Sequence, residues 1–334
     1  MKKLILFLTV VLVLVGSCCQ NEGIPANKKE IMDRFLAGTL DESYVPSAFF
    51  SHFSAREGDA AVQAHLQFFL QTNADVLKVQ FEQRAPRVEN LNVDAGWENI
   101  EMLPEDFYRP TLEIIRQLQA VVGKDVYVLP TIYNPHQVAR QSLTEKYIVE
   151  AATNRPETLK KVLDNYKEAL LWLVRECKAI GIEGFYMTTQ GGEKKFYDIP
   201  GDFYGTFIKP YDMEIMGECC KDTKCNILHI CDWEGTHDDL TRFKDYPAQI
   251  INTPFDLDGT YFSLQDGVEL FGRPVLGGLD RKGEINRLEG QELYEFVDKV
   301  LDEAPKTKTM LGAECTVSVG PEKINTAISA AHNR

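Results

Sequence analysis

Short apolar runs alternate with longer amphipathic stretches along almost the whole chain. The apolar runs have the composition of buried strands and cover residues 44–50, 76–81, 126–133, 184–189, 226–231, 249–253, 274–279 and 309–315. The stretches between them have helical periodicity and cover residues 60–71, 103–122, 157–180, 202–220, 238–243, 263–271 and 290–303, with a last helix expected after Pro321. Eight strand–helix units predict an α/β protein built as one (β/α)8 TIM barrel.

A doubly wound sheet is the alternative for such an alternation. That fold normally has a glycine-rich turn after its first strand, with the pattern Gly-x-Gly-x-x-Gly. The sequence lacks this pattern, and the pair Gly191-Gly192 does not replace it. The barrel is therefore favoured, and we expect the chemistry at the carboxyl ends of its strands.

The first residues have the pattern of an export signal. Lys2 and Lys3 precede an apolar run over residues 4–15, which is too short to span a bilayer comfortably. The segment 15–18 (VGSC) resembles the bacterial lipobox, in which small residues precede a cysteine that becomes lipidated. A plain secretory signal and an uncleaved anchor are the alternatives.

This pattern divides the chain into a lipoprotein signal peptide over residues 1–17, a polar tether over residues 18–27 and a barrel over residues 28–334. Cys18 is the predicted lipidation site. The expected product is an exported bacterial lipoprotein on the periplasmic or cell-surface side, where only the lipid anchor contacts the membrane.

The composition is that of a globular protein, with 334 residues, 44% hydrophobic and 26% charged. A formal net charge of -14 argues against nucleic-acid binding, which needs a cationic surface, so small molecules are the expected ligands. Of the eight cysteines, six lie in the second half of the chain. A domain of this size does not need disulfides for stability. The six cysteines can therefore be core thiols or metal ligands as well as disulfide partners.

One histidine and two cysteines at two predicted strand ends form a candidate zinc site. In the run 226–231, the period of a strand places His229 and Cys231 on one face, toward the barrel interior. In the run 309–315, the same period turns Cys315 inward together with Leu311 and Ala313.

Barrel closure brings these two strand ends toward one mouth. One nitrogen and two thiolates with an open fourth position are typical of a catalytic Zn²⁺ site. The alternatives are buried thiols, a hydrogen-bonded histidine, and a disulfide between Cys231 and Cys315.

Four segments give the chain, after its signal, a resemblance to the uroporphyrinogen decarboxylase superfamily. They are residues 27–38 (NKKEIMDRFLAG) followed by Val45-Pro46, the spaced Phe203, Phe207 and Pro210-Tyr211, residues 277–280 (GGLD), and residues 321–325 (PEKIN). The pair His229 and Cys231 with the distant Cys315 resembles the zinc ligands of the branch that contains the methylcobamide:coenzyme M methyltransferases. This resemblance implies a zinc-dependent methyltransferase that activates a thiol acceptor, with a corrinoid, carried by a partner protein or bound as a ligand, as a possible methyl donor.

The sequence also departs from that branch. Asp232 follows Cys231 and Glu314 precedes Cys315, at positions where the branch usually has glycine. The decarboxylase branch, a carboxy-lyase acting on a tetrapyrrole, resembles the chain less, because Arg56 alone replaces its paired arginines. The decarboxylase alternative would be favoured if four cations converged at the mouth of the barrel. These are Arg56, Lys78, Arg84 and Arg281. A non-catalytic surface binder of a cobamide, porphyrin or other small ligand is the third possibility.

Five further residues near predicted strand ends are candidates for the site. Glu82 is a candidate fourth zinc ligand or general base, and Asp280 is the second candidate catalytic acid. His136, Tyr186 and Gln190 are candidate substrate contacts, for a thiol or a tetrapyrrole-like substrate. A solvated or salt-bridged role for Glu82, a loop role for His136 and barrel packing for Tyr186 are the structural alternatives.

Overall fold

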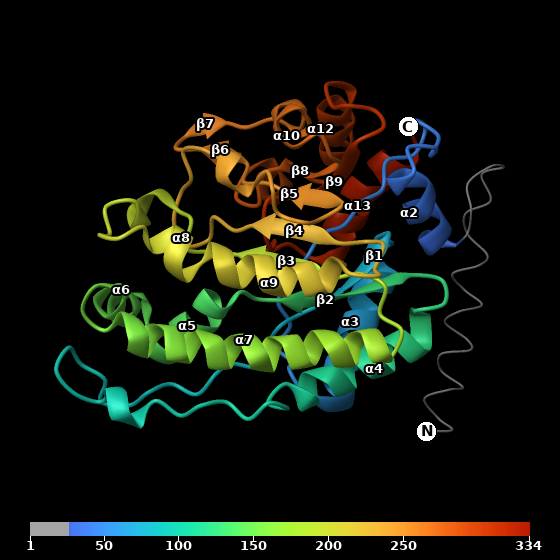
Figure 1. Cartoon of the computed structure of the whole chain (residues 1–334). Coiled ribbons are helices and arrows are strands. Elements are labelled where there is room, and N and C mark those ends of the chain that lie inside the picture. Colours follow the sequence, from blue (N-terminus) through green and yellow to red (C-terminus); the bar gives the residue numbers. More distant parts are fainter. Residues whose placement is uncertain (1–26) are drawn as a thin grey trace.

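The computed structural model describes residues 27–334 and shows a curled parallel sheet with helices outside it (Figure 1). Seven strands form this sheet in the order β1-β2-β3-β4-β5-β8-β9. Their bounds are β1 Val76–Val79, β2 Tyr127–Ile132, β3 Tyr186–Thr189, β4 Ile227–Ile230, β5 Ile250–Asn252, β8 Val275–Leu279 and β9 Thr309–Ala313. The architecture fits a TIM-type barrel. The predicted signal peptide, the lipidation site Cys18 and most of the tether lie outside the described residues.

One helix precedes the segment 44–50, one follows β9, and the others lie between successive strand segments along the chain. Their bounds are α2 Lys28–Leu36, α3 Gly58–Thr72, α4 Arg109–Val122, α5 Pro135–Leu143, α6 Glu145–Asn154, α7 Pro156–Ala179, α8 Phe203–Phe207, α9 Lys209–Cys220, α10 Leu264–Phe271, α11 Glu284–Arg287, α12 Gly290–Asp302 and α13 Pro321–His332. A small antiparallel hairpin, β6 Asp256–Leu257 with β7 Thr260–Tyr261, follows β5. In the described part of the chain, no helix is both long and apolar enough to cross a membrane.

The strands bury both of their faces, as parallel strands between two apolar layers do. The inner faces pack into one cluster, which includes Val76, Tyr127, Tyr186, Ile227, Ile250, Leu276 and Met310. The outer faces pack against the helices in a larger cluster, which includes Leu77, Val128, Met187, Leu228, Ile251, Leu279 and Leu311. Side chains on the inner face therefore decide what lies inside the curled sheet.

The first predicted strand, residues 44–50, is not a regular strand. It forms a single bridge, between Ser47 and Leu311, although its backbone bonds to both neighbours. Ala48 N–H donates to Leu311 O at 2.9 Å, and Asp75 N–H donates to Ser47 O at 2.9 Å. Pro46 has no N–H and Ser47 N–H donates to the Asp75 carboxylate, so two ladder bonds are lost. The segment nevertheless lies between β9 and β1.

Three helix predictions also need correction. Helix α4 begins at Arg109 and not at 103, because the backbone of Leu103 bonds to the side chain of Asn165 in α7. The stretch 202–220 is divided at Ile208, since Pro210 cannot donate to the carbonyl four residues earlier. The stretch 238–243 forms only a short 3-10 helix, Thr241–Phe243, and helices α5 and α6 were not predicted.

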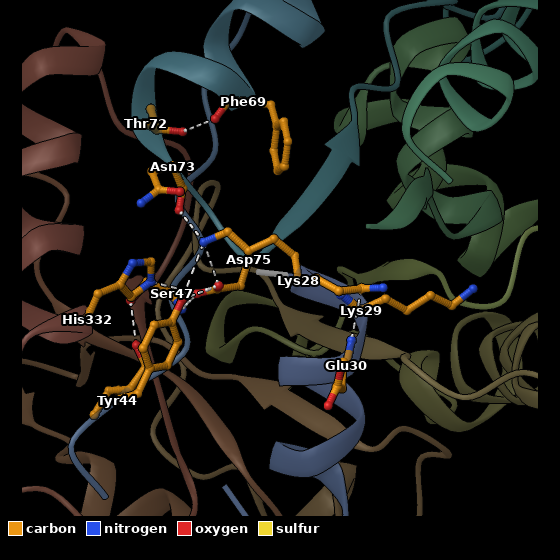
Figure 2. A network of polar contacts seen from close by, with 12 residues as sticks. Lys28, Lys29, Glu30, Tyr44, Ser47, Phe69, Thr72, Asn73, Asp75 and His332 are labelled. Atoms are coloured by element: carbon orange, nitrogen blue, oxygen red, sulfur yellow. Dashed lines mark hydrogen bonds and ion pairs between the residues drawn. The ribbon is translucent and has the colours of Figure 1, made fainter. Parts of the chain in front are cut away.

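A buried carboxylate holds both ends of the described chain against the start of β1 (Figure 2). Asp75 accepts bonds from Lys28 Nζ at 3.0 Å and Tyr44 OH at 2.6 Å on one oxygen. Its other oxygen accepts from Ser47 N–H at 2.7 Å and His332 Nε2 at 2.8 Å. Because Lys28 lies in α2 and His332 ends α13, this network joins the first helix, the bridging segment and the last helix.

Candidate metal centre

Strand β4 presents the first two residues of the site. Ile227 packs in the inner cluster, whereas Leu228 and Ile230 pack in the outer one. The alternation of a strand therefore turns His229 inward, as the sequence predicted. His229 and Cys231 are both buried, with 3% and 4% of their surface exposed.

Cys315 reaches the same place by a different route from the one predicted. Leu311 and Ala313 pack in the outer cluster, so the inward face of β9 holds Met310 instead. The strand ends at Ala313, and the chain bends at residues 314 and 315. This bend, and not the period of the strand, brings the partly buried Cys315 thiol to His229.

These three residues, called the triad below, have the spacing of a metal site. One potential ligand atom from each lies within 4.8 Å of the others. Cys315 Sγ is 3.7 Å from His229 Nε2, and the corresponding edge of a tetrahedron with Zn–S and Zn–N bonds is about 3.6 Å long. Within the described residues, no carboxylate joins the triad. The residues thus fit a zinc ion held by three protein ligands.

The two thiols of the triad are not equivalent. Hydrogen bonds from the Cys231 thiol and the His229 imidazole hold the pKa of Cys315 well below its usual value. The same contact raises the pKa of Cys231. The described cysteines are all free, so the alternative of a disulfide between Cys231 and Cys315 is not the arrangement seen. A thiolate at Cys315 is the form that binds a metal.

Two of the residues predicted to contact substrate also contact the triad. Gln190 Nε2 donates to Cys231 Sγ at 3.1 Å, and Gln190 Oε1 accepts from the guanidinium of Arg140. Tyr186 stacks on His229 with ring centroids 5.4 Å apart, and its hydroxyl donates to Asn252 Oδ1 at 2.9 Å. Hydrogen bonds and packing of this kind orient metal ligands.

The other predicted residues lie outside the triad. Glu82 Oε1 is hydrogen-bonded to His52 Nδ1 at 2.9 Å, and Glu82 Oε2 forms an ion pair with Arg56 Nε at 3.6 Å. Asp280 accepts from the backbone N–H of Lys282 at 2.7 Å and so stabilises a turn.

His136 is enclosed and has 1% of its surface exposed, with the rings of Phe196 and Phe203 against it at 5.5 and 5.8 Å. Burial lowers the pKa of His136 to about 3, so it is neutral at pH 7. The apolar surroundings of this ring do not form an open substrate contact.

A buried ion cluster beside the triad was missed by the sequence analysis. Arg281 Nε lies 3.2 Å from Glu314 Oε1, and Arg281 Nη2 lies 3.7 Å from Asp232 Oδ1. The exposed Trp233 ring covers the guanidinium at 4.7 Å. Asp232 and Glu314 occupy the two positions where the methyltransferase branch that the chain resembles usually has glycine. This departure is the feature of the sequence that could have indicated the ion cluster.

The fold is similar to solved methyltransferase structures. A methyltransferase from Methanosarcina mazei superposes with a TM-score of 0.70 at 14% identity, over 91% of this chain and 98% of that one. A B12-independent methionine synthase from Shewanella sp. W3-18-1, in complex with selenomethionine, has a TM-score of 0.50 at 11% identity, over 87% of this chain and 93% of that one. No protein-family model and no curated protein matches the sequence. At these identities the likeness shows the fold alone, a TIM-type barrel.

Proposed function

We propose that the protein is a zinc-dependent methyltransferase-like enzyme whose acceptor is a thiol. The observation that carries the proposal is the triad, with its ligand atoms within 4.8 Å of one another at the carboxyl ends of β4 and β9. In barrels of this type, that end of the sheet holds the active site. We also propose membership of the uroporphyrinogen decarboxylase superfamily, supported by the sequence motifs and by the methyltransferase-like fold.

The residues of the chain have distinct parts in this scheme. His229 Nε2 and the sulfurs of Cys231 and Cys315 would hold the zinc ion and leave one position open for substrate. Bound there, zinc would supply a lowered pKa for the acceptor thiol. Gln190, by donating to Cys231 Sγ, holds that sulfur in place and tunes its charge.

The acceptor thiol releases its proton to solvent, and methyl transfer then forms a bond between the acceptor sulfur and the methyl carbon. The bond from that carbon to the donor breaks, and the donor keeps its electron pair. A corrinoid, on a partner protein or bound directly, is one donor of this kind; another small methyl donor serves the same chemistry.

The alternative function, a carboxy-lyase acting on a tetrapyrrole, needs cations free to bind the substrate carboxylates. It is disfavoured, because Arg56 pairs with Glu82 and Arg281 pairs with Glu314 and Asp232.

Metal content tests the proposal directly. Protein purified without oxygen or chelator is expected to contain about one zinc per chain by mass spectrometry. Cys231→Ser should lose most of it, because a hydroxyl is a poor zinc ligand, whereas Cys177→Ser is the matched control at a buried thiol outside the triad. Zinc-free wild-type protein, or a Cys231→Ser variant that retains the metal, would rule out the zinc site. The zinc protein is then expected to promote methylation of a small thiol by a methylated corrinoid.

We propose further that Cys18 carries a lipid that anchors the protein outside the inner membrane. Cell fractionation is expected to find wild-type protein with the membranes and Cys18→Ala protein among soluble proteins or unprocessed, because only the cysteine sulfur accepts the lipid. Cys19→Ala is the matched control. Soluble, processed wild-type protein would contradict the anchor and leave a plain secretory signal.

A further inference from the structure

A lysine on β1 projects into the interior of the curled sheet. Lys78 is two residues from Val76, which packs in the inner cluster, so both side chains share one face of the strand. The Lys78 ammonium lies 4.9 Å from the ring centroid of Phe50 and 4.7 Å from that of Tyr186. It donates one hydrogen bond, to Gln80 Oε1, at 3.1 Å. Lys78 is partly buried, and such a charge is costly to remove from water unless an anion balances it.

The described residues supply no free carboxylate for this purpose. Within residues 27–334, Lys78 forms no ion pair, and the nearby Glu82 is already paired with His52 and Arg56. Amide and ring contacts stabilise an ammonium but leave its charge uncompensated. Lys78 is therefore a cation inside the sheet without a counter-ion of its own.

The triad lies next to this cation. Tyr186, whose ring contacts the Lys78 ammonium, stacks on His229 with an interplanar angle of 24°. Burial lowers the pKa of Lys78 to about 8, against the charges of Cys315, Glu82 and Cys231, which raise it. The ammonium is therefore mostly protonated at pH 7, and two of the three anionic groups that act on it are triad sulfurs.

A count of charges shows what the site lacks. The thiolates of Cys231 and Cys315 cancel the two charges of a zinc ion, and a neutral His229 adds none. Among the zinc ion, the triad and Lys78, this leaves one unbalanced positive charge, while Arg281, Asp232 and Glu314 beside them pair with one another. A substrate thiolate in the open position brings one negative charge, whereas a neutral ligand brings none.

We propose that Lys78 balances the charge of the substrate thiolate, so that the site selects an anionic sulfur over a neutral ligand. The proposal rests on the proposed function, since it needs zinc in the triad. It assigns an electrostatic role in substrate binding to Lys78 and so explains why a lysine faces inward from β1. Two unit charges within one site, at an effective dielectric constant of about 20, interact strongly enough to change affinity about 10- to 100-fold.

Two zinc ligands of different charge separate this role from a structural one. Calorimetry on zinc-loaded protein would measure the affinity for 2-mercaptoethanol, which binds as a thiolate, and for imidazole, which binds as a neutral ligand. Lys78→Met is expected to weaken thiol binding about 10- to 100-fold and to leave imidazole binding within about threefold. Lys78→Arg keeps the charge and should retain most of the thiol affinity. Lys282→Met removes an exposed cation after β8 and is the matched control.

The outcomes distinguish this inference from the function on which it rests. Equal thiol affinity in wild type and Lys78→Met would overturn the role of Lys78 and leave the zinc proposal intact. Equal losses for thiol and imidazole would show a structural role and overturn it as well. A wild-type protein that binds no zinc, or binds zinc but no thiol, would overturn the proposed function itself. If Lys78→Met does not fold, Lys78→Arg decides the question, because a loss of thiol affinity there contradicts charge balance.

Discussion

Replacement of Asp75 by asparagine is expected to lower the free energy of unfolding by about 3–5 kcal/mol, the cost of breaking a buried ion pair from one side. The carboxylate is fully buried and bonds to Lys28, Tyr44, Ser47 and His332. Asparagine can keep one acceptor but leaves Lys28 without its counter-charge. Because these partners come from both ends of the described chain, the loss should loosen the closure of the sheet between β9 and β1.

The pH dependence of this effect has a definite sign. Burial raises the pKa of Asp75, but the charges of Lys28 and His332 and the bonds from His332 and Tyr44 more than reverse that, so the folded-state pKa is well below its usual value. The unfolded chain therefore binds the proton more readily. The stabilisation is present above about pH 4, the ordinary aspartate value, and is lost as the pH falls toward the folded-state pKa.

Urea denaturation of wild type and Asp75→Asn at pH 7 and at about pH 3 would measure both effects. The difference between the two proteins should be largest at pH 7 and smaller at the lower pH. Asp94→Asn, at an exposed loop position, makes the same chemical change and is expected to cost less than about 0.5 kcal/mol. A difference below about 1 kcal/mol at pH 7 would show that the Asp75 network does not hold the chain ends.

The alternation of side chains along a strand predicted the inward-facing residues correctly where the strand is regular. The alternation in 226–231 placed His229 on the inner face of β4 because the strand is regular there. The same rule failed for Cys315, since β9 ends at Ala313 and a bend follows. The position of the thiol was found by its residue type and by resemblance, whereas the reason given for its orientation was wrong.

The remaining parts depend on contacts between segments far apart in sequence. The segment 44–50 has strand composition, but Pro46 and the bond from Ser47 to Asp75 prevent a regular ladder. Gln190 was predicted as a substrate contact, and the bond from its amide to Cys231, just after the neighbouring strand, was not predicted. A one-dimensional pattern shows which side chains face inward, and only the folded chain shows which of them meet.

Arg281 is expected to set the affinity of the triad for metal, although it is not a ligand. Its guanidinium joins Asp232, which follows Cys231, to Glu314, which precedes Cys315. The backbone N–H of Arg281 also donates to Glu314 Oε2 at 2.8 Å. One side chain from the end of β8 thus fixes the two cysteine-bearing loops relative to each other, which is how residues outside the ligand set tune a metal site.

Arg281→Met should therefore weaken zinc binding about 10- to 100-fold, as loss of a ligand-orienting partner does. Chelator competition would measure the affinity. The absorption spectrum of the cobalt-substituted protein would report the geometry of the two thiolate ligands. A variant that is less stable but still folded, with its ligands in place, would keep the wild-type spectrum. Arg281→Lys keeps the charge but not the planar fork, so an intermediate affinity is expected. Arg287→Met removes an exposed arginine of α11 and should leave affinity and spectrum unchanged. Wild-type affinity and spectrum in Arg281→Met would show that the bends after β4 and β9 hold the cysteines without help, and the ion cluster would then need another explanation.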